Sequence, residues 1–286
     1  MPLCTLHLLA LDPTTPTPIQ TFLSTLHSAN LSPLVISRVI RWIVLPTKIS
    51  TEHLLAQNIH WDLLLILPTP SPTLPSHLEP LIQHHWSVTA GVPSRLLQDF
   101  PTKNRALLHP DPASVPPLEH QSRSKETTSS SQHLELGGDL NAWIDNFTTS
   151  SKEKVGKGAV SMFNLLSFHP GKKSQYIKYG SAFADSIGSR HGGLAKIVGG
   201  VTHVNGAPTP KDKSGKAEEG EAWDEIAVAH YPSILHFRDM LASADYQDVN
   251  RKFRVGSLLD TCILMTSEIE VEEVGAGDQG RGAAKL

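Results

Sequence analysis

The chain has few of the residues that build disulfide scaffolds, zinc sites or membrane spans. Its 286 residues include only two cysteines, Cys4 and Cys262. Two widely separated cysteines argue against a disulfide framework or a zinc site, and they favour a reducing, cytoplasmic location. No apolar run approaches the roughly 18 residues that cross a bilayer, so we expect no membrane partner. Residues 1–13 lack a basic region and a cleavage site, so no signal peptide is expected.

The chain also has no large excess of positive or negative charge. The chain has 25 Lys and Arg residues against 28 Asp and Glu, which leaves a net charge of −3. Without a basic field, we expect no nucleic-acid partner. The motifs HExxH, GK[ST] and GxSxG are absent too, and Gly192-Gly193 and Gly199-Gly200 do not form a GxGxxG set after a strand. We therefore expect no metal, no nucleotide cofactor and no serine hydrolase site.

The first 110 residues have the pattern of a small α+β unit. Apolar runs of strand length alternate with segments whose apolar residues have helical spacing. The predicted order is βαββαβ, with a short helical turn over 93–99. The strands are expected at 3–11, 34–45, 61–67 and 105–109, and the helices at 17–29 and 76–84.

The remaining chain divides into three parts. Residues 111–138 are polar and rich in proline and serine, which predicts a disordered linker. Residues 139–270 begin with a helix over 139–149 and then again read βαββαβ. A bulge or a close approach is expected at Gly199-Gly200, inside the strand over 194–203. The tail, residues 271–286, is predicted to be disordered.

The two halves repeat each other in letters as well as in order. Trp61-Asp62 corresponds to Trp223-Asp224, and Pro75-Ser76 corresponds to Pro232-Ser233. A βαββαβ unit forms a four-stranded antiparallel sheet with helices on one face. A second copy can cover the other face. The repeat therefore predicts an α+β fold in which two ferredoxin-like halves pair as an intramolecular α/β barrel.

The second half also resembles a known family. The similarity lies in residues 163–166, Tyr176, Tyr179-Gly180, Gly192-Gly193, Trp223-Asp224, residues 231–233, Phe237, residues 243–246 and Arg254. On these residues the chain resembles the domain-of-unknown-function-1330 family of the dimeric α/β-barrel superfamily. The first half looks like a degenerate copy, without a counterpart of Tyr246 or Arg254.

The resemblance implies a site but no particular reaction. In that superfamily two ferredoxin-like units normally pair between chains, and a cavity lies between sheet and helices. Its members include cofactor-free monooxygenases, cyclases, lactone isomerases and haem-degrading enzymes. A tandem fusion implies a monomer with an internal pseudo-dimer, and further dimerisation stays open.

Polar residues of the second half supply the site candidates. Arg254 could grip a carboxylate or enolate, with Tyr246, Tyr231 and Ser233 at the same pocket. The alternative is structural, with Arg254 paired to Asp260 or capping a helix. Asn164 is a further candidate, because it is polar within an apolar strand.

A histidine is the candidate for proton transfer. Among His191, His203, His230 and His236, we select His230, because it lies at a strand end in the segment that resembles the family. The hypothesis is that Arg254 holds an anionic oxygen while His230 moves a proton. The alternative for each of the four is a histidine that is either buried with its hydrogen bonds satisfied or exposed to solvent.

Two functions follow. The first is binding or conversion of a small apolar or aromatic acid without metal or nucleotide. The second is a non-enzymatic scaffold or stress-associated interaction protein, so whether the chain is an enzyme stays open. An interior cavity of about 300 Å³ or more favours the first function, and a packed interior favours the second.

Overall fold

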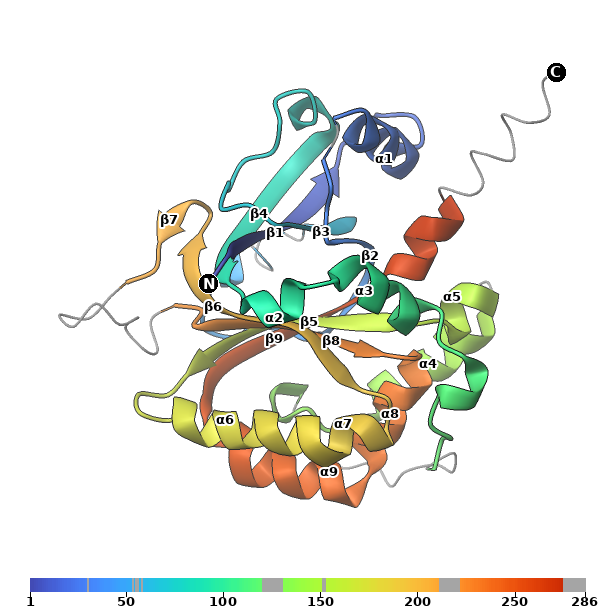
Figure 1. Cartoon of the computed structure of the whole chain (residues 1–286), viewed down its shortest axis with the longest axis vertical. Coiled ribbons are helices and arrows are strands. Elements are labelled where there is room, and N and C mark those ends of the chain that lie inside the picture. Colours follow the sequence, from blue (N-terminus) through green and yellow to red (C-terminus); the bar gives the residue numbers. More distant parts are fainter. Residues whose placement is uncertain are drawn as a thin grey trace.

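The computed structural model describes residues 1–29, 31–52, 54, 57, 59–119, 131–150, 153–210 and 222–274. Within these ranges, helices lie against one large antiparallel sheet, so the fold class is α+β, as the sequence predicts (Figure 1). The strands of the described chain are β1 (Leu3–Leu11), β2 (Val35–Val44), β3 (Leu63–Leu67), β4 (Ile82–Gly91), β5 (Val160–Phe168), β6 (Leu194–Val204), β7 (Ala207–Pro208), β8 (Glu225–Tyr231) and β9 (Leu258–Ser267).

The sheet closes on itself. Its strand order is β4-β1-β3-β2-β9-β5-β8-β6-β7, and β4 also pairs with β6. All strands except β7 therefore form a ring of antiparallel pairs. The first four strands of the chain are adjacent in the order 4-1-3-2, and β9-β5-β8-β6 follow the same order. The two groups meet at β2–β9 and at β4–β6.

Helices cover the outside of the ring. In the first half they are α1 (Pro18–Ser28), α2 (Ser94–Leu97) and α3 (Phe100–Leu108). In the second half they are α4 (Gly138–Ser150), α5 (Glu153–Lys157), α6 (Lys173–Ala182), α7 (Gly188–Arg190), α8 (Ile234–Ala242) and α9 (Ala244–Val249). A last helix spans 268–274. No helix in the described ranges combines the length and the apolar character that a membrane crossing requires.

Short helices of other types complete the structure. The 3-10 turns are η2 (Glu79–Leu81), η3 (Pro112–Ser114) and η4 (Ser131–His133). Two segments are π-helical, η5 (Phe183–Ile187) after α6 and η6 (Asn250–Val255) after α9. Figure 1 shows α6 and α9 on the same side of β5, β8 and β9.

Two predictions for the first half are wrong. The helix expected over 76–84 is replaced by η2 and by the start of β4, because Trp86, Val88 and Ala90 alternate toward the core with the period of a strand. The strand expected over 105–109 is part of α3, which begins with proline in its first turn. The first half therefore lacks a long helix between its third and fourth strands.

The second half has the predicted order of strands and helices, apart from the short strand β7, which was not predicted. The predicted linker differs from the structure at its described ends, because Leu134 and Leu136 are buried against the second half. Residues 120–130 lie outside the described residues. The predicted tail differs in the same way, because residues 271–274 belong to the last helix; residues 275–286 are outside the described residues.

The inner side of the ring is packed with side chains. One buried cluster takes residues from every strand of the ring, which only the inner side permits. It includes Leu6, Leu8, Val35, Leu64, Ile66, Val88, Phe163, Leu165, Ile197, Val228, Cys262 and Leu264. A second cluster joins the outer face of β5, β8 and β9 to α8 and α9, and a third joins β1 and β3 to α1.

Gly199 lies where β6 meets β4, and the close approach predicted there is confirmed. A Cβ atom at this position would be 2.8 Å from the carbonyl oxygen of Gly91 and 3.1 Å from Val92 Cγ2. Only glycine lets the two strands come this close, so the residue fits the closure of the ring.

The two Trp-Asp pairs make matching contacts. Trp61 and Trp223 are both buried in the inner cluster. The Asp62 backbone N–H donates to Leu9 O, and the Asp224 N–H donates to Leu166 O, both at 2.8 Å. The Asp62 carboxylate accepts from the backbone N–H of Leu11, two residues after Leu9 on β1, at 2.9 Å. The Asp224 carboxylate accepts from the backbone N–H of Phe168, two residues after Leu166 on β5, at 2.8 Å.

Candidate functional site

Arg254 is a buried cation without an acidic partner in the described part of the chain. It belongs to η6, and its side chain is among the largest that are fully buried, with 2% of the residue exposed. Its Nη1 donates to the carbonyl oxygen of Gln132 over a long 3.4 Å, and its Nη2 is buried without a hydrogen bond. Burying a charge is costly unless it is paired, so this arrangement demands an explanation.

The alternative that Arg254 pairs with Asp260 does not hold. The Asp260 carboxylate accepts backbone N–H groups from Thr47, Lys48 and Ile49 at distances between 2.8 and 3.2 Å. These bonds fix the turn after β2. Asp260 is therefore occupied at the end of the ring, and the guanidinium does not share it.

All four tyrosines of the chain surround Arg254. They are Tyr176 and Tyr179 of α6, Tyr231 at the end of β8 and Tyr246 of α9. The rings of Tyr176 and Tyr179 are 5.3 Å apart, and those of Tyr179 and Tyr246 meet edge to face at 6.5 Å. Burial raises the pKa of the Tyr176 phenol, and Arg254 is close enough for its charge to offset part of that rise. We call Arg254 and these tyrosines the tyrosine cluster.

The phenols do not neutralise the guanidinium. Burial raises the pKa of all four tyrosines, and the nearby charge of Arg254 offsets only part of that rise. The phenols therefore stay protonated at neutral pH, as hydrogen-bond donors rather than counter-ions. An anion placed here would meet one guanidinium and several O–H donors in a region of low dielectric.

Local structure explains how the cluster forms. Tyr176 and Tyr179 are three residues apart on α6 and therefore share a helix face. The π-helical η5 follows, with Phe183 at 6.3 Å from the Tyr179 ring. The second π-helical segment, η6, carries Arg254. Such widened turns often occur at functional sites, because they redirect side chains that a regular helix would place elsewhere.

Asn164 lies on the sheet face that carries this cluster. Its neighbours on β5, Phe163 and Leu165, belong to the inner cluster, so Asn164 points outward toward the helices. Its Nδ2 donates to Met162 O at 2.8 Å. Asn164 and its strand partner Ala227 are half-buried.

Ser233 is buried near the cluster but serves the start of α8. It occupies the N-cap position, and its Oγ is 2.8 Å from His236 Nδ1. The other nitrogen of His236 bonds the carbonyl oxygen of Pro116 at 3.1 Å. The pair thus fastens the segment after η3 to α8.

His230 lies on the opposite face of β8 from Arg254. Val228 belongs to the inner cluster and Tyr231 to the helix-covered cluster, so alternation along the strand turns His230 inward. Burial, followed by the charge of Lys196, lowers the pKa of His230 to about 3. An imidazole this acidic is a weak general base. The hypothesis that Arg254 and His230 act together at one site is therefore corrected, because the two side chains lie on opposite faces of the sheet.

The sequence did not indicate a buried network near His230. Lys196 of β6 contacts Glu268 and donates to Asn104 Oδ1 at 2.9 Å, while Asn104 Nδ2 donates to Glu268 Oε2 at 2.7 Å. These residues come from β6, the last helix and α3. The one signal in the letters is a lysine inside the apolar stretch LAKIVGG.

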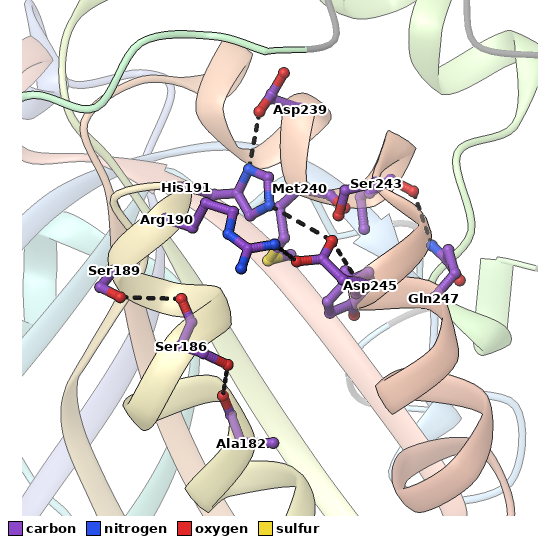
Figure 2. A network of polar contacts seen from close by, with 12 residues as sticks. Ala182, Ser186, Ser189, Arg190, His191, Asp239, Met240, Ser243, Asp245 and Gln247 are labelled. Atoms are coloured by element: carbon purple, nitrogen blue, oxygen red, sulfur yellow. Dashed lines mark hydrogen bonds and ion pairs between the residues drawn. The ribbon is translucent and has the colours of Figure 1, made fainter.

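A second network connects α7 to α8 and α9. Figure 2 shows His191 Nδ1 against Asp239 Oδ2, at 2.8 Å, and Arg190 paired with Asp245. His191 and Asp239 are both buried. Asp239 is on α8, whose N-cap is Ser233, so the network fixes the helices around the tyrosine cluster.

One groove lies elsewhere in the described structure. It has a volume of about 600 Å³ and lies between α3 and the last helix, above Leu34 and Ile36. Glu268 lines it, but Arg254 does not. Within the described ranges, no three His, Cys, Asp or Glu side chains are grouped to hold a metal ion.

Comparisons with known proteins give no assignment. No family model matches the chain, and no curated protein matches it. The crystal structure of RPA0582, a protein of unknown function from Rhodopseudomonas palustris, is 18% identical and covers 47% of this chain and 95% of its own, with a TM-score of 0.31. The structure of methylated RPA0582 is 19% identical and covers 48% and 94%, with a TM-score of 0.34. The resemblance drawn from the sequence therefore stays a prediction.

Proposed function

We propose that the second half binds a small apolar or aromatic organic acid, with its anionic group on Arg254. The observation that carries the proposal is a guanidinium that is 2% exposed, has no acidic partner in the described chain and leaves Nη2 unbonded. A carboxylate or enolate would supply the missing charge and acceptor in a bidentate geometry.

The surroundings of Arg254 favour an acid with an apolar or aromatic body. Tyr176, Tyr179 and Tyr246 offer aromatic surface, and their protonated hydroxyls can donate to further oxygens. Asn164 lies on the same sheet face and adds an amide. The proposal takes Arg254, Asn164, Tyr231 and Tyr246 as binding residues. It omits His230, which faces the inside of the ring, and treats Ser233 as a support of α8.

We further propose that the chain is a fusion of two ferredoxin-like halves in an intramolecular α/β barrel. Three features support this proposal: the strand order 4-1-3-2 occurs twice, β4 and β9 join the halves in equivalent ways, and the two Trp-Asp pairs match in their bonds. The domain-of-unknown-function-1330 resemblance of the second half is kept as part of the same proposal. Such a chain would act as a monomer with an internal pseudo-dimer, and the free, buried Cys4 and Cys262 suit a cytoplasmic location.

A non-enzymatic scaffold is the second candidate. The packed inner side of the ring favours it, because a ligand cannot enter there without displacing core side chains. The two candidates differ at Arg254. In a scaffold Arg254 only stabilises the fold, whereas in a binding protein it binds the anionic group of a ligand.

The test is a melting experiment with benzoate and 4-hydroxybenzoate on the full chain and on Arg254→Met. Ligand at a hundred times its Kd stabilises by about 2.7 kcal/mol, which raises the Tm of a chain of this size by roughly 4–5 °C. We expect this rise in the natural chain and none in the variant. We also expect the unliganded variant to be as stable as the natural chain, since methionine removes an unpaired charge. No rise with either acid, together with a variant destabilised by several kcal/mol, would favour the scaffold.

A further inference from the structure

The segment 132–136 covers the tyrosine cluster. Three consecutive carbonyl groups of this segment are each held by one side chain of α9 or η6. Gln247 Nε2 donates to Leu134 O at 3.4 Å, Asn250 Nδ2 to His133 O at 2.7 Å, and Arg254 Nη1 to Gln132 O at 3.4 Å. We call residues 132–136 the strap.

The three donors form one recognition surface. Gln247, Asn250 and Arg254 are spaced by three and four residues, so they lie along one side of the α9–η6 helical segment. On the strap they bind only backbone carbonyls, and at Arg254 a carboxylate can replace such a group. Gln247 Nε2 also donates to Leu241 O of α8 at 2.8 Å, and Asn250 Nδ2 also donates to Gln247 Oε1 at 3.2 Å, so these two side chains are anchored within the helices.

Two further contacts hold the strap from the other side. Leu134 and Leu136 are buried in the cluster that contains Tyr231 and Tyr246. The Gln132 side chain donates through Nε2 to Thr261 O at 3.1 Å and to Leu45 O. The strap thus rests on β2 and β9 at one end and on the helices along its length.

The closed strap leaves polar groups unsatisfied. Arg254 Nη2 and Glu135 Oε2 are both buried without a hydrogen bond. Two of the three carbonyl bonds have a donor–acceptor distance of 3.4 Å, beyond the usual range of about 2.7–3.2 Å, so they are weak. Buried polar groups normally form hydrogen bonds, so the closed strap leaves the hydrogen-bonding capacity of Arg254 poorly satisfied.

We infer that the strap is the gate of the Arg254 site, and that a bound acid displaces it by taking the place of the Gln132 carbonyl. The ligand half of this inference rests on the proposed function, whereas the covering of Arg254 does not. An acid would then bind the open population only, so loosening the strap raises its apparent affinity.

The test uses the full chain and the variant Gln132→Ala, which removes the bonds to Leu45 and Thr261 but leaves the backbone carbonyl facing Arg254. Asn250→Ala is the second variant, in case one change alone does not loosen the strap. The matched control is Gln175→Ala, which removes a glutamine bond to Lys252 O on η6, at 3.1 Å, away from the strap.

Three readouts are compared. Hydrogen exchange followed by mass spectrometry measures the strap amides, phenylglyoxal modification with peptide mapping measures access to Arg254, and titration measures the Kd for 4-hydroxybenzoate. We expect the strap variants to raise strap exchange about tenfold and Arg254 modification about fivefold, and to tighten the Kd by about three- to tenfold. The control should change none of them.

The outcomes separate the two proposals. Faster strap exchange without faster Arg254 modification would overturn the inference, since the strap would then not control access to Arg254. Faster exchange and modification with a weaker or unchanged Kd would also overturn the gate. If modification accelerates but 4-hydroxybenzoate binds no variant, the strap still stands as the cover of Arg254, and the acid-binding function fails.

Discussion

Replacing Gly199 by alanine probes the contact that closes the ring. The new Cβ would lie 2.8 Å from the carbonyl oxygen of Gly91, 3.1 Å from Val92 Cγ2 and 3.2 Å from Ala90 Cβ. The first of these atoms is backbone, so the clash cannot be relieved by turning a side chain. β4 and β6 must separate, and overpacking of this kind costs about 1–3 kcal/mol.

The next residue provides a matched control. A Cβ on Gly200 would meet nothing within 4 Å. Both substitutions reduce the freedom of the unfolded chain, which stabilises by about 0.4–1 kcal/mol at a compatible site. This gain is common to the two variants, so their difference isolates the clash at the β4–β6 contact.

The assay is urea unfolding of both variants, followed by far-UV circular dichroism. We expect Gly200→Ala to be as stable as the natural chain or slightly more stable, and Gly199→Ala to be less stable by about 1–3 kcal/mol. If the Gly199 variant matches the Gly200 variant, the two strands do not meet as closely as the structure shows, and the reasoning about ring closure is refuted.

Three other predictions concern buried polar groups. Lys196→Met leaves the Glu268 carboxylate buried without its cation, so thermal unfolding should show a loss of about 3–5 kcal/mol in the free energy of unfolding. The double variant Lys196→Met with Glu268→Met should recover most of that loss. Equal losses in the single and the double variant would contradict the buried ion pair. The pKa of His230 is lowered to about 3 in the folded chain, against about 6.5 in the unfolded chain. The neutral imidazole therefore contributes fully to the free energy of unfolding above pH 6.5, and this contribution falls by about 1.4 kcal/mol per pH unit as the pH falls toward 3. His230→Gln should remove that one-proton slope from urea unfolding measured between pH 4 and 7, and an unaltered slope would count against the buried position. Asp62→Ala and Asp224→Ala each leave a strand-end N–H unpaired, so denaturant unfolding should show similar losses of about 1–3 kcal/mol, and a large loss in one half only would weaken the repeat.

The sequence predicted several elements correctly. Alternation identified β2, helical spacing identified α1 and α6, and length with flanking residues identified β1 and β3, although the leucines of β3 also suit a buried helix. It failed where a local signal conflicted with the packing of the sheet. Residues 76–84 carry a proline-serine start that resembles a helix entry, yet the alternation of Trp86, Val88 and Ala90 wins, because those side chains fill the inner side of the ring.

The candidate site was predicted in part, for reasons visible in its geometry. Arg254, Tyr231 and Tyr246 meet as the sequence suggested, because they lie on neighbouring elements of the second half. His230 could not be separated from them by letters alone, since one step along a strand reverses the face. The strap was missed because a polar, proline-rich composition hides the two leucines, Leu134 and Leu136, that seat it.

The most direct measurement of the Arg254 proposal is identification of small molecules retained by the purified full-length chain. Native mass spectrometry, with metabolite extraction, should be applied in parallel to the natural chain and to Arg254→Met. The account predicts that the natural chain retains an organic acid with an apolar or aromatic body, and that the variant loses it while staying folded. An identical set of retained molecules in both proteins, or retention of the acid by the variant, would contradict the assignment of Arg254 as the anion-binding residue.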